Sequence, residues 1–170
     1  MIKPRINGFK DAIVATLKEK IPHLRECRAQ FGRFNLDELE KESIRTPAIT
    51  VGLLNGKASA QPSGHSEITF SCAAFIVTDG KTREDDAWNL AEAVIKILHS
   101  GQMFGLTKLN VPASVVVQPV ISASIRTKGV AILAVEWSQI LREIGENVFD
   151  ENGHVITELY INGEAIEVLP

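Results

Sequence analysis

The chain has 170 residues, the length of a single domain, and a folded protein of this size buries roughly 70% of the surface that its unfolded chain exposes. Hydrophobic residues make up 45% of the chain and charged residues 23%, which is the composition of an ordinary globular protein. No apolar run reaches the ~18–20 residues that cross a bilayer, and a net charge of −3 argues against a tight nucleic-acid binder, which normally shows a basic face.

The N-terminal region begins with a predicted amphipathic helix at residues 4–20. Its apolar face carries Ile6, Phe9, Ile13 and Leu17. Pro22 ends the helix, because proline cannot continue one. Residues 25–33 are polar and basic, and we interpret them as a connector. Asn35 followed by Glu38 resembles a capping box and predicts a short helix to about residue 43.

Two strands are predicted next. Residues 47–54 form a continuous β-branched run behind a proline, which suits a buried strand. Asn55 and Gly56 then predict a turn, and the small polar residues 57–66 predict a mobile loop. Residues 67–78 alternate between polar and apolar before an apolar run, which predicts a long strand in which a bulge can occur.

Residues 82–101 give the clearest helical pattern in the chain, and we expect the fold to be organised around this helix. Its apolar positions include Trp88, Ala91, Ile95 and Leu98. Neighbouring apolar residues widen this stripe to more than half of the helix surface, so we expect the helix to be covered on most sides. Thr82 predicts the N-cap and Gly101 the C-terminal end. The acids that suit the positive end of the helix dipole are Glu84, Asp85 and Asp86.

Two further strands are predicted at residues 113–121 and 128–141. The link between them is short, so an antiparallel hairpin is the simplest pairing. Alternate residues of the second strand point to opposite faces. The predicted core face of that strand carries Leu133, Val135, Trp137 and Leu141.

Residues 155–168 predict a C-terminal hairpin that turns at Asn162 and Gly163, the preferred two-residue pair. The resulting register sets Leu159 opposite Ile166 and Glu158 opposite Glu167. Like charges facing each other are mildly destabilising, so the face with the glutamates is expected to be solvated or to meet a basic partner. An isolated hairpin is marginal in water, so this one is expected to lean on the domain or on another chain.

The order of these elements predicts an α+β fold. We expect an antiparallel or mixed four-stranded sheet with two main helices packed on it, because the strands come in adjacent pairs. Residues 1–145 would form this domain. Residues 146–170 would form a hairpin extension packed on it or on a neighbouring subunit.

No motif in the chain specifies a reaction. The four histidines, His23, His65, His99 and His154, lie in predicted turns, loops or helix ends. Carboxylates such as Asp85 and Asp86, used with His65 or His99, leave a small intracellular hydrolase or nuclease open as an alternative. Cys27 and Cys72 are interpreted as buried reduced thiols. We therefore expect no catalytic residue, no cofactor and no bound metal.

Several residues are candidates for contact with partners or neighbouring subunits. Arg25 and Arg28 belong to the only basic cluster of the sequence, which lacks the interleaved aromatic residues of single-strand binders and suits a solvated face or a patch between subunits. The loop and the hairpin offer further contact surfaces. The candidate partner or subunit contacts are Lys57, Gln61, His65, Arg25, Arg28, Glu158, Tyr160 and Glu167.

Two stretches carry a resemblance to a known family. Residues 44–51, IRTPAITV, and 129–139, GVAILAVEWSQ, flank the predicted central helix. Together they resemble the tail proteins of Mu-like phages and prophages, a group similar to the tail terminators typified by that of phage lambda. The similarity covers about residues 6–141 and rests on apolar strand patterns, not on catalytic signatures.

The resemblance implies a non-enzymatic α+β subunit that assembles with its own copies into a ring, expected to be a hexamer. Such a ring caps the tail tube, ends its growth and presents a surface for head joining. The implied partners are the tail tube protein and head-tail connector proteins, and DNA would pass through the ring without specific binding. Assembly in the bacterial cytoplasm, with no membrane contact, follows from the same resemblance. A generic interaction module, whose hairpin adds to a partner's sheet, stays open as a further alternative.

Overall fold

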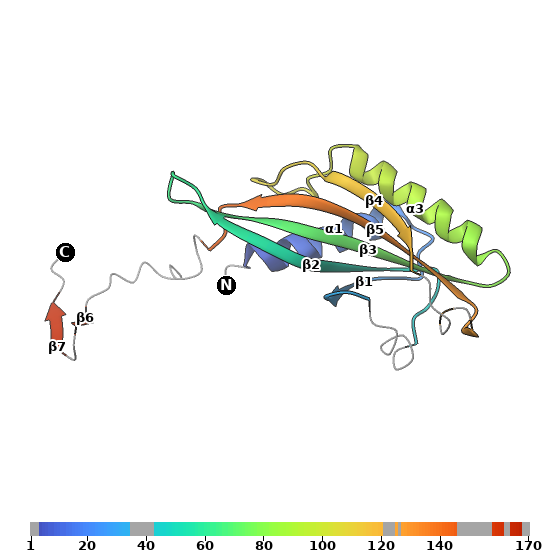
Figure 1. The fold of residues 1–170 in the computed structure, drawn as a ribbon, viewed down its shortest axis with the longest axis horizontal. Coiled ribbons are helices and arrows are strands. Elements are labelled where there is room, and N and C mark those ends of the chain that lie inside the picture. Colours follow the sequence, from blue (N-terminus) through green and yellow to red (C-terminus); the bar gives the residue numbers. More distant parts are fainter. Residues whose placement is uncertain are drawn as a thin grey trace.

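A computed structural model describes residues 4–34, 43–120, 125, 127–145, 158–161 and 164–167. The elements are α1 (Arg5–Lys20), β1 (Glu26–Phe31), β2 (Ala48–Ala60), β3 (Ser66–Asp79), α3 (Arg83–His99), β4 (Ala113–Pro119), β5 (Val130–Arg142), β6 (Glu158–Ile161) and β7 (Glu164–Glu167). One mixed sheet has the strand order β1-β2-β3-β5-β4, and β6 and β7 form a separate sheet (Figure 1). The predicted α+β class is confirmed. Nearly all of the predicted short helix at residues 35–43 lies outside the described residues.

The main sheet has five strands and not the predicted four, because the supposed connector at residues 25–33 contains β1. β1 pairs in parallel with β2, from Glu26 beside Ala48 to Phe31 beside Leu53. None of its residues is fully buried. Its residues do alternate between polar and apolar, but the run is short, Cys27 and Ala29 are small, and the stretch is rich in arginine, so its pattern indicates a polar connector.

The predicted turn at Asn55 and Gly56 is wrong, and so is half of the predicted loop at residues 57–66. β2 continues through both residues to Ala60, with a register shift just before Asn55. The extra residue of such a bulge keeps the strand paired where a turn was expected. The chain reverses instead between Gln61 and His65, where the N–H of Gln61 donates to the His65 carbonyl at 2.8 Å. Figure 1 shows this β2–β3 hairpin projecting from the body of the sheet.

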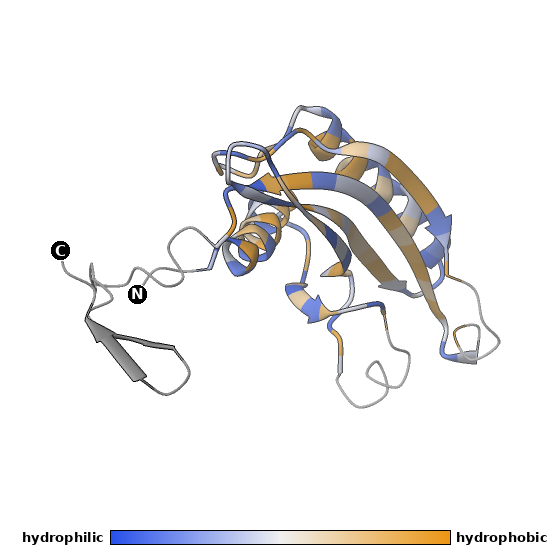
Figure 2. Ribbon diagram, turned by 60° about the vertical axis from the view of Figure 1, so that its left-hand side comes forward, coloured by the Kyte–Doolittle hydropathy of each residue, from blue (hydrophilic) through white to orange (hydrophobic). Residues whose placement is uncertain are grey.

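Both helices pack on one face of the sheet, α1 over β1 and β2 and α3 over β3 and β5 (Figures 1 and 2). The largest side chains that are fully buried in this layer are Phe9, Ile13, Leu17, Ile49, Ile76, Leu98 and Leu141. The predicted core face of β5 is confirmed, since Leu133, Val135, Trp137 and Leu141 all belong to this cluster. The antiparallel pairing of β4 with β5 is also confirmed.

The prediction that the central helix is covered on most sides is wrong. α3 buries one stripe, which consists of Ala87, Ala91, Val94 and Leu98. A helix that packs on one sheet face needs only one such stripe, and Trp88 is therefore left 50% exposed. Thr82 is the N-cap residue, but its hydroxyl donates to the Asp86 carboxylate at 2.7 Å and does not cap the backbone.

The face of the sheet away from the helices is also covered at its centre. Phe75 and Ala134 are buried there beside the half-buried Phe34, and the rings of Phe34 and Phe75 lie 5.6 Å apart. Val77 and Ile132 are buried a little further along with Ile125. The sequence pattern of β5 marked only one face as core, whereas the structure buries part of both.

The close approach of β2 to the residue after β1 gives a first testable consequence. A Cβ added at Gly52 would lie 2.6 Å from the backbone carbonyl oxygen of Gly32, which cannot rotate away. We expect Gly52→Ala to lower the free energy of unfolding by about 1–3 kcal/mol, the usual range for overpacking. Gly8→Ala is the matched control, because a Cβ at Gly8 in α1 meets nothing within 4 Å. That change should stabilise the helix by roughly 0.5–1 kcal/mol. Urea unfolding measures both, and equal effects of the two changes would contradict the close approach.

Candidate assembly surfaces

The predicted contact residues fall into separate parts of the molecule. Lys57, Gln61 and His65 lie on the projecting β2–β3 hairpin. Arg25 and Arg28 lie at the β1 edge of the sheet. The remaining residues, Glu158, Tyr160 and Glu167, lie in the β6–β7 sheet. No single site collects all of these residues.

The base of the β2–β3 hairpin carries two ion pairs, Arg142 with Glu67 at 3.4 Å and Lys108 with Glu143 at 2.8 Å. These four residues, with Gln61 and His65 among others, line an open hollow of about 540 Å³. The hydrogen bond from Lys108 holds the pKa of the Glu143 carboxyl below its ordinary value, and the charges of Lys108 and His65 act in the same direction. The carboxylate therefore stays ionised, and the hollow presents charges of both signs.

The β6–β7 hairpin has the predicted register, with Glu158 beside Glu167 and Leu159 beside Ile166. The turn predicted at residues 162–163 lies outside the described residues. The two glutamates are direct cross-strand neighbours. Like charges in that position repel, so we still expect this face to meet solvent or a basic partner. Whether the hairpin leans on the domain or on a neighbour stays a prediction.

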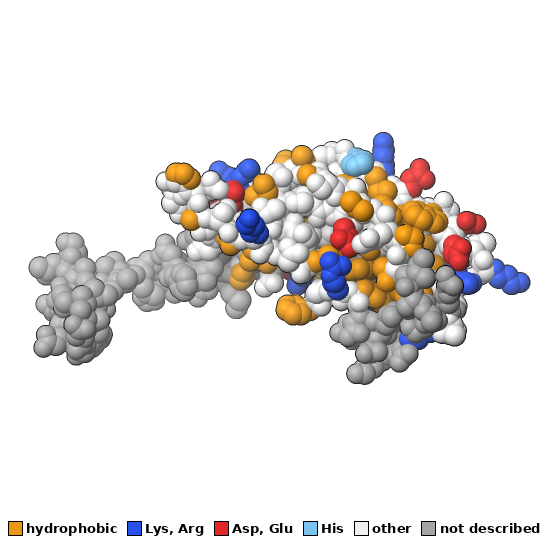
Figure 3. All heavy atoms as spheres, in the orientation of Figure 1, with side chains coloured by type: hydrophobic (Ala, Val, Ile, Leu, Met, Phe, Trp, Pro, Cys, Tyr) orange, Lys and Arg blue, Asp and Glu red, His pale blue; other side chains and the backbone are white. Residues whose placement is uncertain are grey.

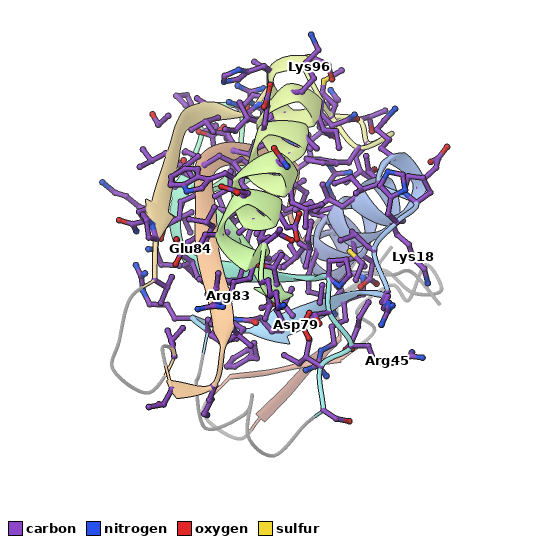
Figure 4. The ribbon with its side chains drawn as sticks, turned by 90° about the vertical axis from the view of Figure 1, so that its right-hand side faces the viewer. Lys18, Arg45, Asp79, Arg83, Glu84 and Lys96 are labelled. Atoms are coloured by element: carbon purple, nitrogen blue, oxygen red, sulfur yellow. The ribbon has the colours of Figure 1, made fainter. Side chains whose placement is uncertain are left out.

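One open edge of the main sheet is β1, and within the described residues no strand pairs with its outer side. The carboxylate of Glu26 accepts a hydrogen bond from the Arg45 N–H at 3.0 Å and forms an ion pair with Arg28 at 3.1 Å. Arg25, Arg45 and Lys18 are exposed on this side of the molecule. Figure 4 places Lys18 and Arg45 on the flank of α3 that faces α1. This edge is therefore basic.

The other open edge is β4, which likewise has a neighbour on one side only in the described part of the sheet. Beside its end, the open side of α3 and the start of β5 enclose a hollow of about 330 Å³. Its lining is mostly apolar and includes Ala87, Trp88, Pro119, Val120 and Ile125, with Glu84 at the rim. Figure 3 shows the hydrophobic side chains gathered between α3 and β4. Figure 4 places Glu84 on this flank, across α3 from Lys18.

Large hydrophobic side chains are exposed at both edges, and the sequence analysis predicted none of them as contacts. Phe31, the last residue of β1, is 105% exposed. On and near β4, Val116 is 54% and Val111 52% exposed. Trp88 adds a half-exposed indole on the same side. The two edges therefore differ in shape. The β1 edge carries one protruding ring, and the β4 edge carries valines and an indole beside a hollow.

The residues of the enzyme alternative are not brought together. Asp85 and Asp86 lie in the first turn of α3, and His99 ends the same helix about 20 Å away. His65 lies at the far end of β3, on the order of 40 Å along the strand. His23 and Asp86 both line an open hollow with Asp79. Among the described residues, no cluster of acidic, cysteine or histidine side chains could hold a metal ion.

Both cysteines are free thiols, as predicted, but only one is fully buried. Burial raises the pKa of the Cys72 thiol far above its ordinary value. Cys27 is half-buried against α1, where its Sγ lies 3.6 Å from the Val14 carbonyl oxygen, and burial raises its pKa to about 11. Because the thiolate is the reactive form, neither residue is suited to nucleophilic chemistry at neutral pH.

Comparison with known proteins adds no family assignment. No protein-family model matches the chain, and no curated protein matches its sequence. Within the described ranges, no helix combines the length and the apolar character that crossing a membrane requires. The two sequence stretches that resemble tail proteins and the surfaces described above are the features that bear on function.

Proposed function

We propose that this protein is a non-enzymatic structural subunit of phage or prophage tail assembly, of the tail-terminator type. Copies of the chain would form a ring that caps the tail tube and ends its growth, with the tail tube protein and head-tail connector proteins as partners. DNA would pass through the ring without specific binding, and assembly would take place in the bacterial cytoplasm.

One observation carries the proposal beyond the sequence resemblance. The main sheet ends in two open edges of different chemistry, a basic edge with the protruding Phe31 at β1 and an apolar edge beside Trp88 at β4. A contact between two unlike surfaces of identical subunits is a head-to-tail contact, and such contacts form a ring when the rotation between neighbours closes. A self-complementary dimer would instead use the same surface twice. The two-edged architecture therefore favours a ring over a dimer.

The projecting β2–β3 hairpin supports the second part of the proposal. It extends past the end of β1, so it adds contact surface that the sheet edges do not use. Its exposed residues include Lys57 and His65, Gln61 is half-buried, and its base carries the charges of Glu67, Lys108, Arg142 and Glu143. We assign this surface to contact with the tail tube or the head side, since polar surfaces with both signs of charge suit separable partners.

The function can be tested with purified protein and tail tubes of the phage or prophage that encodes it. We expect negative-stain images to show rings alone and rings seated on tube ends, and we expect added protein to stop tube elongation. A variant that carries Lys57→Glu and His65→Glu on the hairpin should still form rings but cap tubes less often. Unlimited tube growth in the presence of assembled wild-type rings would contradict the proposed function.

A further inference from the structure

We infer that neighbouring copies join by strand pairing, with the outer edge of β4 of one copy against the outer edge of β1 of the next, so that the sheets run on from subunit to subunit. The inference rests on the proposed function in one respect, that the chain assembles with itself. It goes further in naming the joint and the residues that make it.

The directions of the strands permit this joint. β1 and β2 run parallel, and each later step through β3, β5 and β4 is antiparallel. β1 and β4 therefore run in opposite directions within one sheet. When copies repeat in the same orientation, as neighbours in a ring with strands along its axis do, β4 meets the next β1 antiparallel. Antiparallel addition of an edge strand is a common mode of protein association.

Within the described residues no strand pairs with the outer side of β4, so its outward backbone groups can make these bonds. The N–H of Val120 donates to the Ile132 carbonyl at 2.9 Å, which fixes the alternation along the strand. Gln118 then directs its backbone groups toward β5, whereas Val117 and Pro119 direct theirs outward. Pro119 has no N–H to donate and so sits where a proline is tolerated, on the open side of an edge strand. Val117 offers both a donor and an acceptor to a neighbour.

Hydrophobic side chains lie at matching heights on the two edges. Following the register across the sheet, Phe31 is level with Leu53, Cys72 and Trp137, which belong to the layer under the helices. On β4, Val117 pairs with Val135 and packs against the same layer, whereas Val116 pairs with Glu136 and points to the opposite face. A neighbour placed without vertical offset therefore brings the Phe31 ring close to the half-buried Val117 of β4, on the same face of the sheet. Burying this ring removes from water a side chain that is otherwise fully exposed.

The charges on the two sides are complementary as well. Lys18, Arg25 and Arg45 are exposed on the β1 side. On the β4 side, Glu84 and Glu92 are exposed on α3, and their spacing of eight residues puts them on one flank with Trp88. Lys81 and Arg83 lie at the N-terminal end of α3. The acidic surface is therefore the flank with Glu84 and Glu92, and not the whole N-terminal end of the helix. Head-to-tail association brings the basic side against the acidic flank, which favours this pairing over edge-to-like-edge contacts.

Two variants that each block one edge test the joint. Phe31→Lys places a charge on the β1 edge at a position that the fold does not bury. Val117→Pro removes an N–H that points outward from β4. Position 117 is two residues before the natural Pro119, so its backbone groups point to the same open side. Each variant alone should be monomeric at concentrations where the wild type assembles, with a roughly tenfold or larger loss of affinity for its blocked contact. Thermal unfolding checks that both are folded, and Val116→Lys replaces Val117→Pro if the proline variant is not.

Mixing the two variants gives the decisive readout by sedimentation velocity. The Phe31→Lys chain keeps an intact β4 edge and the Val117→Pro chain keeps an intact β1 edge, so the mixture should form a one-to-one dimer and nothing larger. Assembly of either variant alone as in the wild type, or a mixture that stays monomeric or grows beyond the dimer, would overturn the joint. Wild-type rings together with such a result would leave the proposed function standing. A wild type that never associates would overturn both.

Discussion

Replacing Gln139 with leucine is expected to destabilise the fold by about 2–5 kcal/mol, because it removes the partner of the buried Trp137 indole N–H and of two part-buried carbonyls. The Gln139 side chain is fully buried in β5. Its carbonyl oxygen accepts from the Trp137 indole N–H at 2.9 Å, and its amide donates to the carbonyls of Asn110 at 2.8 Å and Gln102 at 3.2 Å. Urea unfolding at constant m-value measures the loss.

Gln118→Leu is the matched control for this prediction. Gln118 lies on β4, is exposed, and donates to the Glu136 carboxylate at 3.1 Å in contact with solvent. The same chemical change should alter the free energy of unfolding there by no more than about 0.5 kcal/mol. A similar small effect at Gln139 would show that the buried amide does not hold the segment after α3 against β5. That segment includes Val111, so loosening it should also weaken self-association.

Leu133→Ala is expected to lower the free energy of unfolding by about 2–5 kcal/mol, the range for a buried leucine that leaves a cavity. Leu133 is 4% exposed and lies in the layer between the sheet and the helices. Val116→Ala on the neighbouring strand removes methyl groups from a side chain that is 54% exposed, and should cost much less. Thermal and urea unfolding of the pair compare the two sites. A loss at Leu133 no larger than that at Val116 would mean that this end of β5 is not core.

The fold could be predicted where a residue pattern depends on local geometry alone. The sequence patterns of α1, α3, β3, β4 and β5 place these elements to within a few residues of the observed bounds. β1 was missed although its residues alternate, because the run is short, its apolar residues Cys27 and Ala29 are small, and the stretch is rich in arginine. The Asn55-Gly56 pair misled for a different reason, since its turn preference is overridden when β2 stays paired with β3 across a bulge. That failure concerns pairing between distant segments, which no local pattern records.

The candidate surfaces, like the fold, could be predicted from the sequence only in part. Lys57, Gln61 and His65 could be expected at a surface, because they lie in a small and polar stretch. Phe31 and Val116 could not, because a hydrophobic residue in a predicted strand or connector normally predicts core. Their exposure follows from the strand order, which leaves β1 and β4 at the two ends of the sheet. Trp88 was placed in the apolar stripe of α3 for the same reason, and half of it is exposed because the helix packs on one face only.

The mass of the full-length protein in solution tests the central claim most directly, because a structural ring subunit must associate with its own copies. Light scattering after gel filtration should give a single closed species at micromolar concentration, with the hexamer as the expected multiple of the 18.6 kDa chain. The mass should not grow further with concentration, as it would for an open filament. A stable species of 18.6 kDa across micromolar concentrations, unchanged when tail tubes are added, would contradict the account.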